Sequence, residues 1–154
     1  RRGLTPEIPG TGRRFACNMM SAITNRGQLA FMVFKCRFTA RVMIVFLRRL
    51  VRHARRKVFL IVDGHPVHGA KAVHLWLARH AEHIRMFLLP EYSPELNPDE
   101  LLNNDVKSNA LGRRRPADQT EMISDVRSYL RGTQRRPDIV ISYFQDEHVR
   151  YAAQ

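Results

Sequence analysis

One stretch decides the fold of this chain: residues 57–107, KVFLIVDGHPVHGAKAVHLWLARHAEHIRMFLLPEYSPELNPDELLNNDVK. Within it, residues 58–62 form an unbroken apolar run that stops at Asp63, and residues 84–89 form a second run, apolar except for Arg85. Between the runs, apolar side chains recur every three or four residues, which predicts a helix. Strand, helix and strand at this spacing predict a βαβ unit with a parallel sheet. Continuous apolar runs are typical of strands buried on both faces.

Two carboxylates follow the strands of this predicted unit. Asp63 ends the first strand, and Glu100 follows the loop that leaves the second. Sites in open α/β sheets lie just beyond the carboxyl ends of strands, so both acids are expected at one edge. Convergent carboxylates with no adjacent base are suited to hard divalent cations, and sharing an ion predicts a separation of roughly 4–8 Å.

Each carboxylate also has a commoner structural explanation when it is taken alone. Asp63 and Gly64 form a dipeptide that is frequent in turns. Residues 97–100, NPDE, fit a capping box in which the Asn is the N-cap, the Pro is the first helical residue and Glu100 is the third. A capping role and a metal-binding role are compatible, because the box fixes the carboxylate on the first turn of a helix.

Composition and charge indicate a globular protein with a polyanionic partner. The 154 residues suit one domain, and 44% hydrophobic residues exclude wholesale disorder. No apolar run approaches the length of a membrane span, and the N-terminal residues do not resemble a secretory signal. The 26 basic and 14 acidic residues give a net charge of +12, which favours nucleic acid over a merely solubilising surface. Cys17 and Cys36 make no disulfide framework, which indicates a reduced, cytoplasmic protein.

The remaining sequence divides into an extended lead-in over residues 1–12, a core over residues 13–111 and C-terminal helices over residues 112–154. The core opens with a hairpin, and a two-residue loop at Arg26-Gly27 predicts that Cys17 faces Cys36 and that Met19 faces Phe34. Four further helices are expected, over residues 40–54 (with Thr39 as the N-cap), 98–111 (ended by Gly112), 116–131 (closed by Gly132) and 137–152.

Arginines gather at two places that serve either as phosphate-binding surfaces or as ordinary solvated faces. Arg48, Arg52 and Arg55 lie opposite the apolar stripe of the helix that follows Thr39. Arg113, Arg114 and Arg115 follow Gly112. These six residues are the candidate DNA contacts.

The histidine pairs His65/His68 and His80/His83 invite a zinc interpretation, but neither pair has cysteine partners at zinc-finger spacing. His80 and His83 are better explained as residues at a helix end. His68 is close enough to Asp63 in sequence to orient a phosphate or a metal ligand, although a plain helix-entry role is commoner.

Residues 59–68, FLIVDGHPVH, and residues 88–107, LLPEYSPELNPDELLNNDVK, resemble the second and third acidic segments of DDE transposases. The likeness is greatest to the bacterial insertion-sequence transposases related to the mariner superfamily, and it covers roughly residues 3–111. The hairpin of residues 12–40 is similar to the middle segment of that family. The resemblance implies an α/β, RNase H-like fold, a mixed sheet flanked by helices, that binds two Mg²⁺ or Mn²⁺ ions through three acids. Asp63 would be the second acid and Glu100 the third.

The first acid of this family lies on the first strand of the sheet, upstream of the hairpin. Residues 1–62 contain no Asp, and Glu7 is their only acid. We therefore expect a single domain, residues 1–154, that is the C-terminal part of a catalytic domain lacking the first strand. The resulting gap is expected to be closed by residues 4–10, by direct pairing of the strand edges or by a second copy of the chain.

The resemblance implies DNA strand cleavage and strand transfer at transposon ends in the intact protein. Whether the chain is an enzyme on its own stays open, and we expect it not to cut DNA because its two-metal site is incomplete. A non-catalytic DNA-binding remnant and a stand-alone RNase H-like nuclease are the alternatives. The expected partners are transposon-end and target DNA, with a homodimer left open, no membrane, and a cytoplasmic, nucleoid-associated location in a bacterium.

Overall fold

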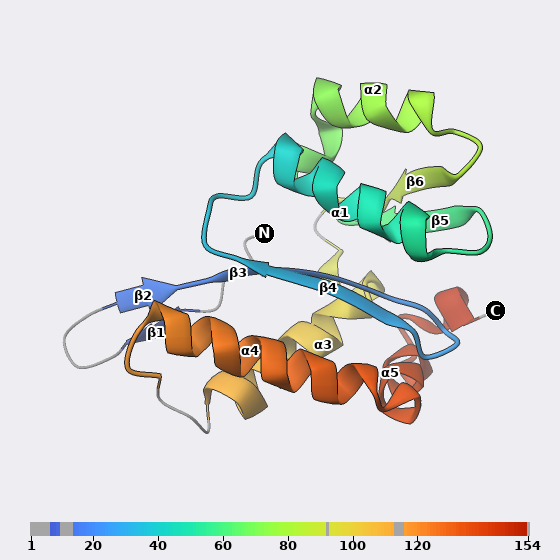
Figure 1. The fold of residues 1–154 in the computed structure, drawn as a ribbon. Coiled ribbons are helices and arrows are strands. Elements are labelled where there is room, and N and C mark those ends of the chain that lie inside the picture. Colours follow the sequence, from blue (N-terminus) through green and yellow to red (C-terminus); the bar gives the residue numbers. More distant parts are fainter. Residues whose placement is uncertain (1–6, 10–13, 92, 113–115, 154) are drawn as a thin grey trace. The chain divides into compact units, whose positions relative to one another are not determined.

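The computed structural model describes residues 7–9, 14–91, 93–112 and 116–153. The chain divides into two compact units. One is Arg37–Asn97, here called the βαβ unit. The other joins Arg1–Cys36 to Pro98–Gln154 and is here called the hairpin unit. Figure 1 shows the elements of both.

The βαβ unit contains the parallel strand pair that the sequence predicts. Strand β5 (Val58–Val62) pairs with β6 (Ile84–Leu88) in parallel, with Val58 opposite Ile84 and Val62 opposite Leu88. The crossover between them consists of a short 3₁₀ turn, η1 (Pro66–Gly69), and helix α2 (Lys71–Arg79). The predicted strand–helix–strand order is confirmed.

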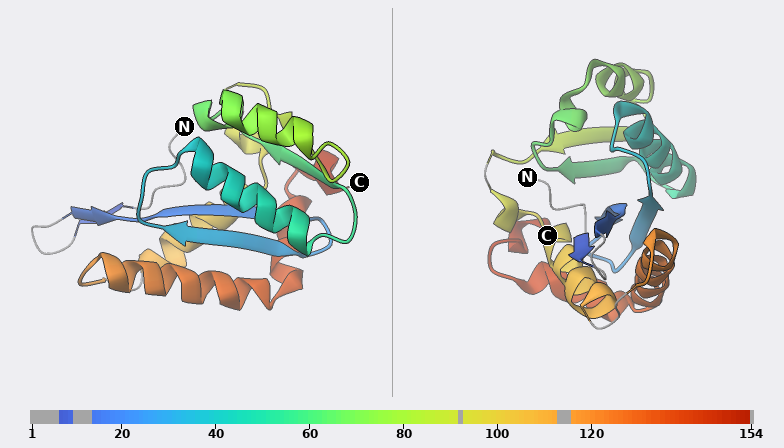
Figure 2. Two further views of the ribbon diagram at one scale, coloured as in Figure 1. Left: turned by 45° about the horizontal axis from the view of Figure 1, so that its top comes forward. Right: turned by 90° about the vertical axis from the view of Figure 1, so that its left-hand side faces the viewer.

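Helix α1 (Ala40–His53) begins as expected, because the side chain of Thr39 accepts a hydrogen bond from the Val42 N–H at 3.4 Å. The helices α1 and α2 pack against each other on one side of the β5–β6 pair (Figures 1 and 2). The opposite face of the pair exposes Phe59, Ile61 and Phe87. The prediction of strands buried on both faces is therefore wrong, since only one side of this pair carries helices within the unit.

The hairpin unit is built on β3 (Asn18–Ile23) and β4 (Leu29–Phe34), which pair antiparallel. Met19 faces Val33 rather than Phe34, so the predicted register is wrong by one residue. The cause is the turn, which spans more than two residues: the Thr24 N–H donates to the Gln28 carbonyl, and the Gly27 N–H donates to the Thr24 carbonyl. Within the predicted lead-in, β1 (Glu7–Pro9) pairs antiparallel with β2 (Arg14–Ala16).

Three helical segments follow the hairpin in this unit. Helix α3 (Asp99–Asp105) continues as a π-helical segment, Val106–Leu111, and Gly112 ends it as predicted. A Cβ at Gly112 would lie 2.6 Å from the carbonyl oxygen of Ser108, so only glycine fits there.

Helix α4 (Gln119–Gln134) starts three residues later and ends three residues later than predicted. Its start is a capping box: the Asp118 side chain accepts from the Glu121 N–H, and the Glu121 carboxylate accepts from the Ala117 N–H. Gly132 does not end the helix, because Thr133 and Gln134 are held by hydrogen bonds to the carbonyls of Tyr129 and Leu29.

The last predicted helix is shorter than expected. Helix α5 (Pro137–Ser142) passes into a 3₁₀ turn, Tyr143–Gln145, and the chain then becomes extended at Asp146, whose side chain accepts from the His148 N–H. A second 3₁₀ turn occupies Arg150–Ala153. The competing side-chain hydrogen bond of Asp146 explains why the helix does not continue.

The core of the hairpin unit lies between the hairpin and the helices α3, α4 and α5, which lie on one side of it (Figures 1 and 2). It is formed by apolar side chains that alternate along both strands and recur along each helix. The buried cluster includes Cys17, Met19, Leu29, Val33, Leu102, Val106, Met122, Val126, Leu130 and Val140.

The described strands form three separate two-stranded sheets, β1–β2, β3–β4 and β5–β6. Among these residues, Glu7–Pro9 pairs with β2 and not with the edge of β3–β4 or β5–β6. Of the expected ways to close a strand gap, pairing by the lead-in is therefore not seen within the described part of the chain. No helix of that part is both long and apolar enough to cross a membrane.

Candidate functional site

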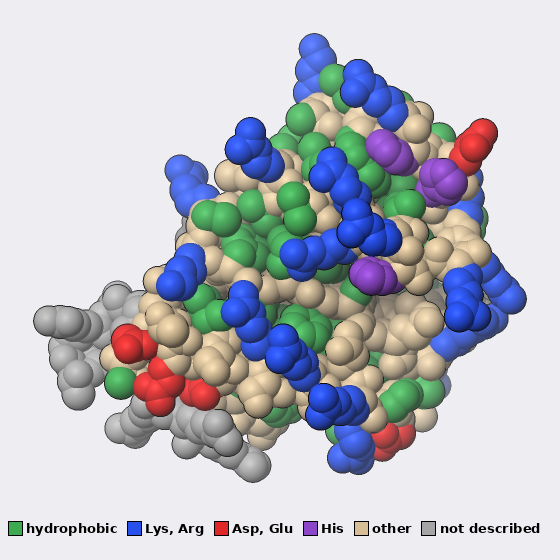
Figure 3. All heavy atoms as spheres, in the orientation of Figure 1, with side chains coloured by type: hydrophobic (Ala, Val, Ile, Leu, Met, Phe, Trp, Pro, Cys, Tyr) green, Lys and Arg blue, Asp and Glu red, His purple; other side chains and the backbone are tan. Residues whose placement is uncertain are grey.

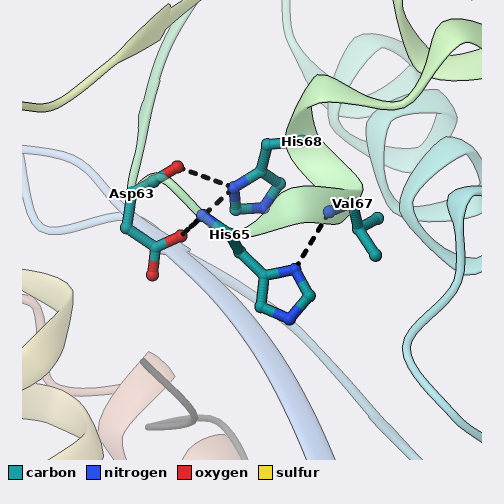
Figure 4. Close-up of polar contacts among 4 residues, drawn as sticks. All are labelled: Asp63, His65, Val67 and His68. Atoms are coloured by element: carbon teal, nitrogen blue, oxygen red, sulfur yellow. Dashed lines mark hydrogen bonds and ion pairs between the residues drawn. The ribbon is translucent and has the colours of Figure 1, made fainter. Parts of the chain in front are cut away.

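Asp63 lies directly after the last residue of β5, where the sequence predicts a site. Its carboxylate oxygen Oδ1 accepts a hydrogen bond from the His65 backbone N–H at 3.0 Å and lies 3.2 Å from Nδ1 of His68 (Figure 4). The same Nδ1 is 2.9 Å from the carbonyl oxygen of Asp63. The side chain is about 30% exposed, so it is oriented by the loop and still reaches solvent.

These contacts keep Asp63 ionised. The hydrogen bond from His68 is the main cause that lowers the pKa of the Asp63 carboxyl, and the backbone N–H of His65 works in the same direction. Partial burial opposes them but does not prevail. At neutral pH the group is therefore a carboxylate with an oxygen available to a ligand.

His65 is fixed in one neutral form. Its Nδ1 accepts a hydrogen bond from the Val67 N–H at 3.1 Å, so the ring proton of the neutral imidazole is on Nε2 (Figure 4). Burial lowers the pKa of His65, and the neighbouring His68 adds to the effect. The ring packs on Phe38, with the centroids 5.0 Å apart. A ring held in this way donates from Nε2 and does not serve as a metal ligand, which argues against zinc at this histidine pair.

Glu100 lies in the first turn of α3 and is half-buried. By its hydrogen bonds the helix begins at Asp99 with Pro98 at the N-cap and no side-chain cap at that residue, so the predicted N-cap, Asn97, is one residue too early. Pro98 already has helical dihedral angles (φ −61°, ψ −23°), which blurs the boundary. Asp99 is buried, and its two carboxylate oxygens accept from the Ser21 hydroxyl at 2.7 and 2.8 Å. Ser21 thus ties the start of α3 to the hairpin.

The two predicted acids belong to different units, Asp63 to the βαβ unit and Glu100 to the hairpin unit. Their convergence on one ion stays a prediction. Among the described residues, no group of three or more His, Cys, Asp and Glu side chains is arranged to hold a metal ion. The carboxylate pair remains the candidate for that role.

The predicted arginine surface on α1 is present. Arg48 and Arg52 are exposed one turn apart on the helix, and Arg55 is exposed just after its end. The helix contains no acidic residue, and the βαβ unit as a whole has 11 basic against 4 acidic residues, a net charge of +7. Figure 3 shows Lys and Arg side chains along α1. The other candidates, Arg113, Arg114 and Arg115, lie outside the described residues.

In the second histidine pair, His80 has a structural role at the end of α2, as the sequence predicts. The His80 ring stacks on Trp76 with the centroids 3.9 Å apart, and its Nδ1 donates to the Trp76 carbonyl at 2.7 Å. Both contacts stabilise the end of α2, where a free carbonyl would otherwise lack a partner.

Two contributors to the site were not predicted. Phe38 packs on both His65 and His68, and Ser21 binds Asp99. Phe38 and Ser21 lie tens of residues away in sequence, and no local pattern marks them. The Trp76–His80 contact carries a signal that would have found it, because residues four apart on a helix share a face.

The chain was compared with models of protein families and with curated proteins. A family model described as DDE superfamily endonuclease matches residues 1–123. A search of curated proteins finds no significant match.

Two solved structures are similar to nearly the whole chain. The crystal structure of the catalytic domain of Mos1 mariner transposase is 16% identical, with a TM-score of 0.62, over 97% of this chain and 80% of that one. A structure of the Mos1 transposase catalytic domain and raltegravir with Mg is 16% identical, with a TM-score of 0.63, over 97% of this chain and 81% of that one. At this identity the likeness establishes the fold alone.

Proposed function

Because the chain belongs to the DDE superfamily of endonucleases and has an RNase H-like fold, we propose that it is part of a transposase catalytic domain. In the intact protein this domain cuts DNA at transposon ends and transfers the strand to target DNA. Asp63 and Glu100 would hold the Mg²⁺ or Mn²⁺ ions that the reaction uses. The observation that supports this most is Asp63, an ionised carboxylate at the carboxyl end of a parallel strand, held there by its own loop.

The donor atoms suit such ions. Carboxylate oxygens are the ligands that Mg²⁺ and Mn²⁺ prefer, and Asp63 offers one while its other oxygen is hydrogen-bonded. Glu100, in the first turn of α3, is the second donor in this proposal. Bound divalent ions would supply charge stabilisation for the attacking and leaving oxygens of a phosphodiester. The task of the chain's own residues is to fix the two carboxylates and to bind the DNA backbone.

Residues 1–154 by themselves should bind metal weakly and should not cut DNA. Residues 1–62 contain no Asp, and two divalent ions would need more oxygen donors than the carboxylates of Asp63 and Glu100 supply. Asp63 and Glu100 alone offer donors for one ion. We therefore treat residues 1–154 as the C-terminal part of a catalytic domain whose site is completed by an acid outside this sequence.

The test is Mn²⁺ binding, read from the paramagnetic broadening of amide signals near residues 63–65 and 99–101. Asp63→Asn and Glu100→Gln should each weaken it by about tenfold or more, while Glu147→Gln, an exposed acid of the hairpin unit, should not change it. Broadening that is unchanged in Asp63→Asn would contradict the assignment.

A nicking assay on supercoiled DNA with Mn²⁺ tests the expected inactivity. The chain should leave the plasmid intact. Robust nicking that is lost in Asp63→Ala would show that another residue of this chain takes the place of the missing first acid.

A non-catalytic DNA-binding module is the second candidate. The observation that favours it is α1, whose exposed arginines have no acidic neighbour on the helix. Such a module would bind DNA with an affinity that neither Mn²⁺ nor a substitution of Asp63 changes. A stand-alone RNase H-like nuclease would instead cut another nucleic acid. DNA as the partner would also account for a cytoplasmic, nucleoid-associated location. Whether the chain forms a homodimer can be measured by analytical sedimentation.

A further inference from the structure

Among the described residues, the hydrogen bonds to the carboxylate of Asp63 reach one of its two oxygens. Oδ1 accepts from the His65 N–H and from Nδ1 of His68, while the Asp63 carbonyl also accepts from that Nδ1 (Figure 4). Within the described part of the chain, no such contact is recorded at Oδ2. The arrangement fixes the side-chain torsions and leaves a single oxygen for a ligand.

The proton position on His68 follows from its partners. A carbonyl oxygen only accepts hydrogen bonds, so the Nδ1 that lies 2.9 Å from the Asp63 carbonyl must carry the proton. Donation to Oδ1 at 3.2 Å comes from the same N–H, shared between the two oxygens. A neutral imidazole is enough to make both contacts.

The His68 ring itself is immobilised. It is 5% exposed and packs edge-on against Phe38, with the centroids 5.8 Å apart. The His65 ring lies 5.8 Å away and is in turn anchored by the Val67 N–H. The donor is therefore held in place before any ligand arrives, and Asp63 does not have to be reoriented on binding.

The chemistry of the donor matters for a cation site. A lysine or arginine in this place would also hold the carboxylate, but its permanent charge would repel a divalent cation at close range. A neutral N–H fixes the carboxylate and leaves its negative charge for the metal. Ligand-orienting hydrogen bonds of this kind are worth about 10–100-fold in metal affinity.

We propose that His68 is the positioning residue of the metal ligand Asp63, presenting Oδ2 as a single-oxygen ligand to a divalent cation. The inference rests on the proposed function, because it assumes that Asp63 binds the ion. It adds a specific role for a residue that is otherwise a buried member of the 3₁₀ turn η1.

The experiment is a Mn²⁺ titration of the whole chain, read from the broadening of the amide signals of Gly64 and His65. His68→Asn and His68→Leu form a matched pair, since the two side chains have nearly the same shape and only Asn carries an N–H donor at the position of Nδ1. His68→Phe keeps a ring against Phe38 and also lacks the donor. Near-ultraviolet circular dichroism of Trp76 verifies that each variant is folded.

We expect Leu and Phe to weaken Mn²⁺ binding by about tenfold and Asn to restore it to within about threefold of the unsubstituted chain. Binding by the folded Leu or Phe variant that equals that of the unsubstituted chain would overturn the role of His68. Equal losses in the Asn and Leu variants would do the same, because the loss would then be due to packing. Asp63→Asn distinguishes a failure of the role of His68 from a failure of the proposed function. If Asp63→Asn leaves the broadening unchanged, Asp63 does not bind the ion, and the proposed function on which the role of His68 rests is wrong.

Discussion

Burial gives the two cysteines of this chain different chemistry. Cys17 lies in the core of the hairpin unit at 2% exposure, while Cys36 is exposed. Burial raises the pKa of the Cys17 thiol to about 11, and the positive charge of Arg127 only partly offsets this. Since the thiolate is the reactive form, a thiol with this pKa is inert at neutral pH even before its inaccessibility is considered.

A thiol reagent at pH 8 should therefore label the two cysteines in two separate phases. Cys36 should react at the rate of an exposed thiol, and Cys17 should react only as fast as the hairpin unit opens. Cys36→Ser should remove the fast phase and leave the slow one. Two fast equivalents in the native protein would show that Cys17 is not part of a stable core.

The same pKa predicts how stability changes in alkaline solution. Below pH 9 the thiol is protonated in both the folded and the unfolded chain, so Cys17 contributes no pH dependence. Between pH 9 and 11 the unfolded chain loses the proton first, and the free energy of unfolding should fall as the pH rises. Denaturant unfolding of the chain and of Cys17→Ala at pH 8 and pH 10.5 measures this. A steeper loss in Cys17→Ala than in the unsubstituted chain would contradict it.

The sequence predicted where Asp63 lies but not how it is held. A carboxylate at the end of an apolar run places it at the strand end by chain connectivity alone. Its partners depend on the 3₁₀ turn η1, which brings His68 back over the carbonyl of Asp63. Phe38, which packs on His65 and His68, comes from the segment before α1. Such contacts arise from tertiary packing, and no local spacing encodes them.

At the scale of the elements, glycine acts in opposite ways at two positions. Gly132 lies inside α4, and a Cβ there would meet nothing within 4 Å. Gly27 has φ +90°, and a Cβ there would lie 2.6 Å from the Cβ of Pro137 and 2.8 Å from its carbonyl oxygen. Nothing in the structure requires a glycine at position 132. At position 27 two features require one: the positive φ and the close approach of Pro137.

Gly132→Ala should stabilise the chain by about 0.5–1 kcal/mol, because alanine restricts the unfolded chain and suits a helix interior. Gly27→Ala should destabilise it by about 1–3 kcal/mol, since it strains the turn and collides with the start of α5. Urea denaturation of both variants gives the two values. A loss of stability in Gly132→Ala would mean that α4 ends before that residue in solution.

Elements were predicted well where one local signal determined them. Strand β5 has the predicted bounds, and Thr39 caps α1. Ends and registers were predicted poorly where distant contacts decide. Helix α4 passes its glycine because Gln134 binds the carbonyl of Leu29 in the hairpin. The hairpin register differs by one residue because the Thr24–Gln28 turn is wider than a two-residue loop.

At the scale of the whole molecule, the parallel βαβ order followed from the spacing of the apolar runs, and the RNase H-like fold followed from the resemblance. The separation of the described strands into three two-stranded sheets was not predicted. Pairing between distant strands depends on non-local geometry that a single sequence does not display.

Charge is the other property of the whole molecule. The chain carries a net +12, of which the βαβ unit carries +7. A surface that contacts phosphates releases counterions from DNA, and the logarithm of the affinity then falls linearly with the logarithm of the salt concentration. A surface that only keeps the protein in solution shows little such dependence. Binding should also differ little between DNA sequences, because phosphate contacts carry no base information.

Substitution of the α1 arginines tests whether they contact DNA phosphates or only keep the protein in solution. Replacing Arg48, Arg52 and Arg55 by Gln should reduce the slope of log affinity against log salt by about 2–3, since each phosphate contact contributes about 0.9. The control replaces Arg79, Arg131 and Arg135, which are exposed on other parts of the chain, and removes the same three charges. Fluorescence anisotropy with a labelled duplex in rising salt gives both slopes. Equal changes in the two triple variants would mean that net charge acts on DNA as a whole, and that α1 is an ordinary solvated helix.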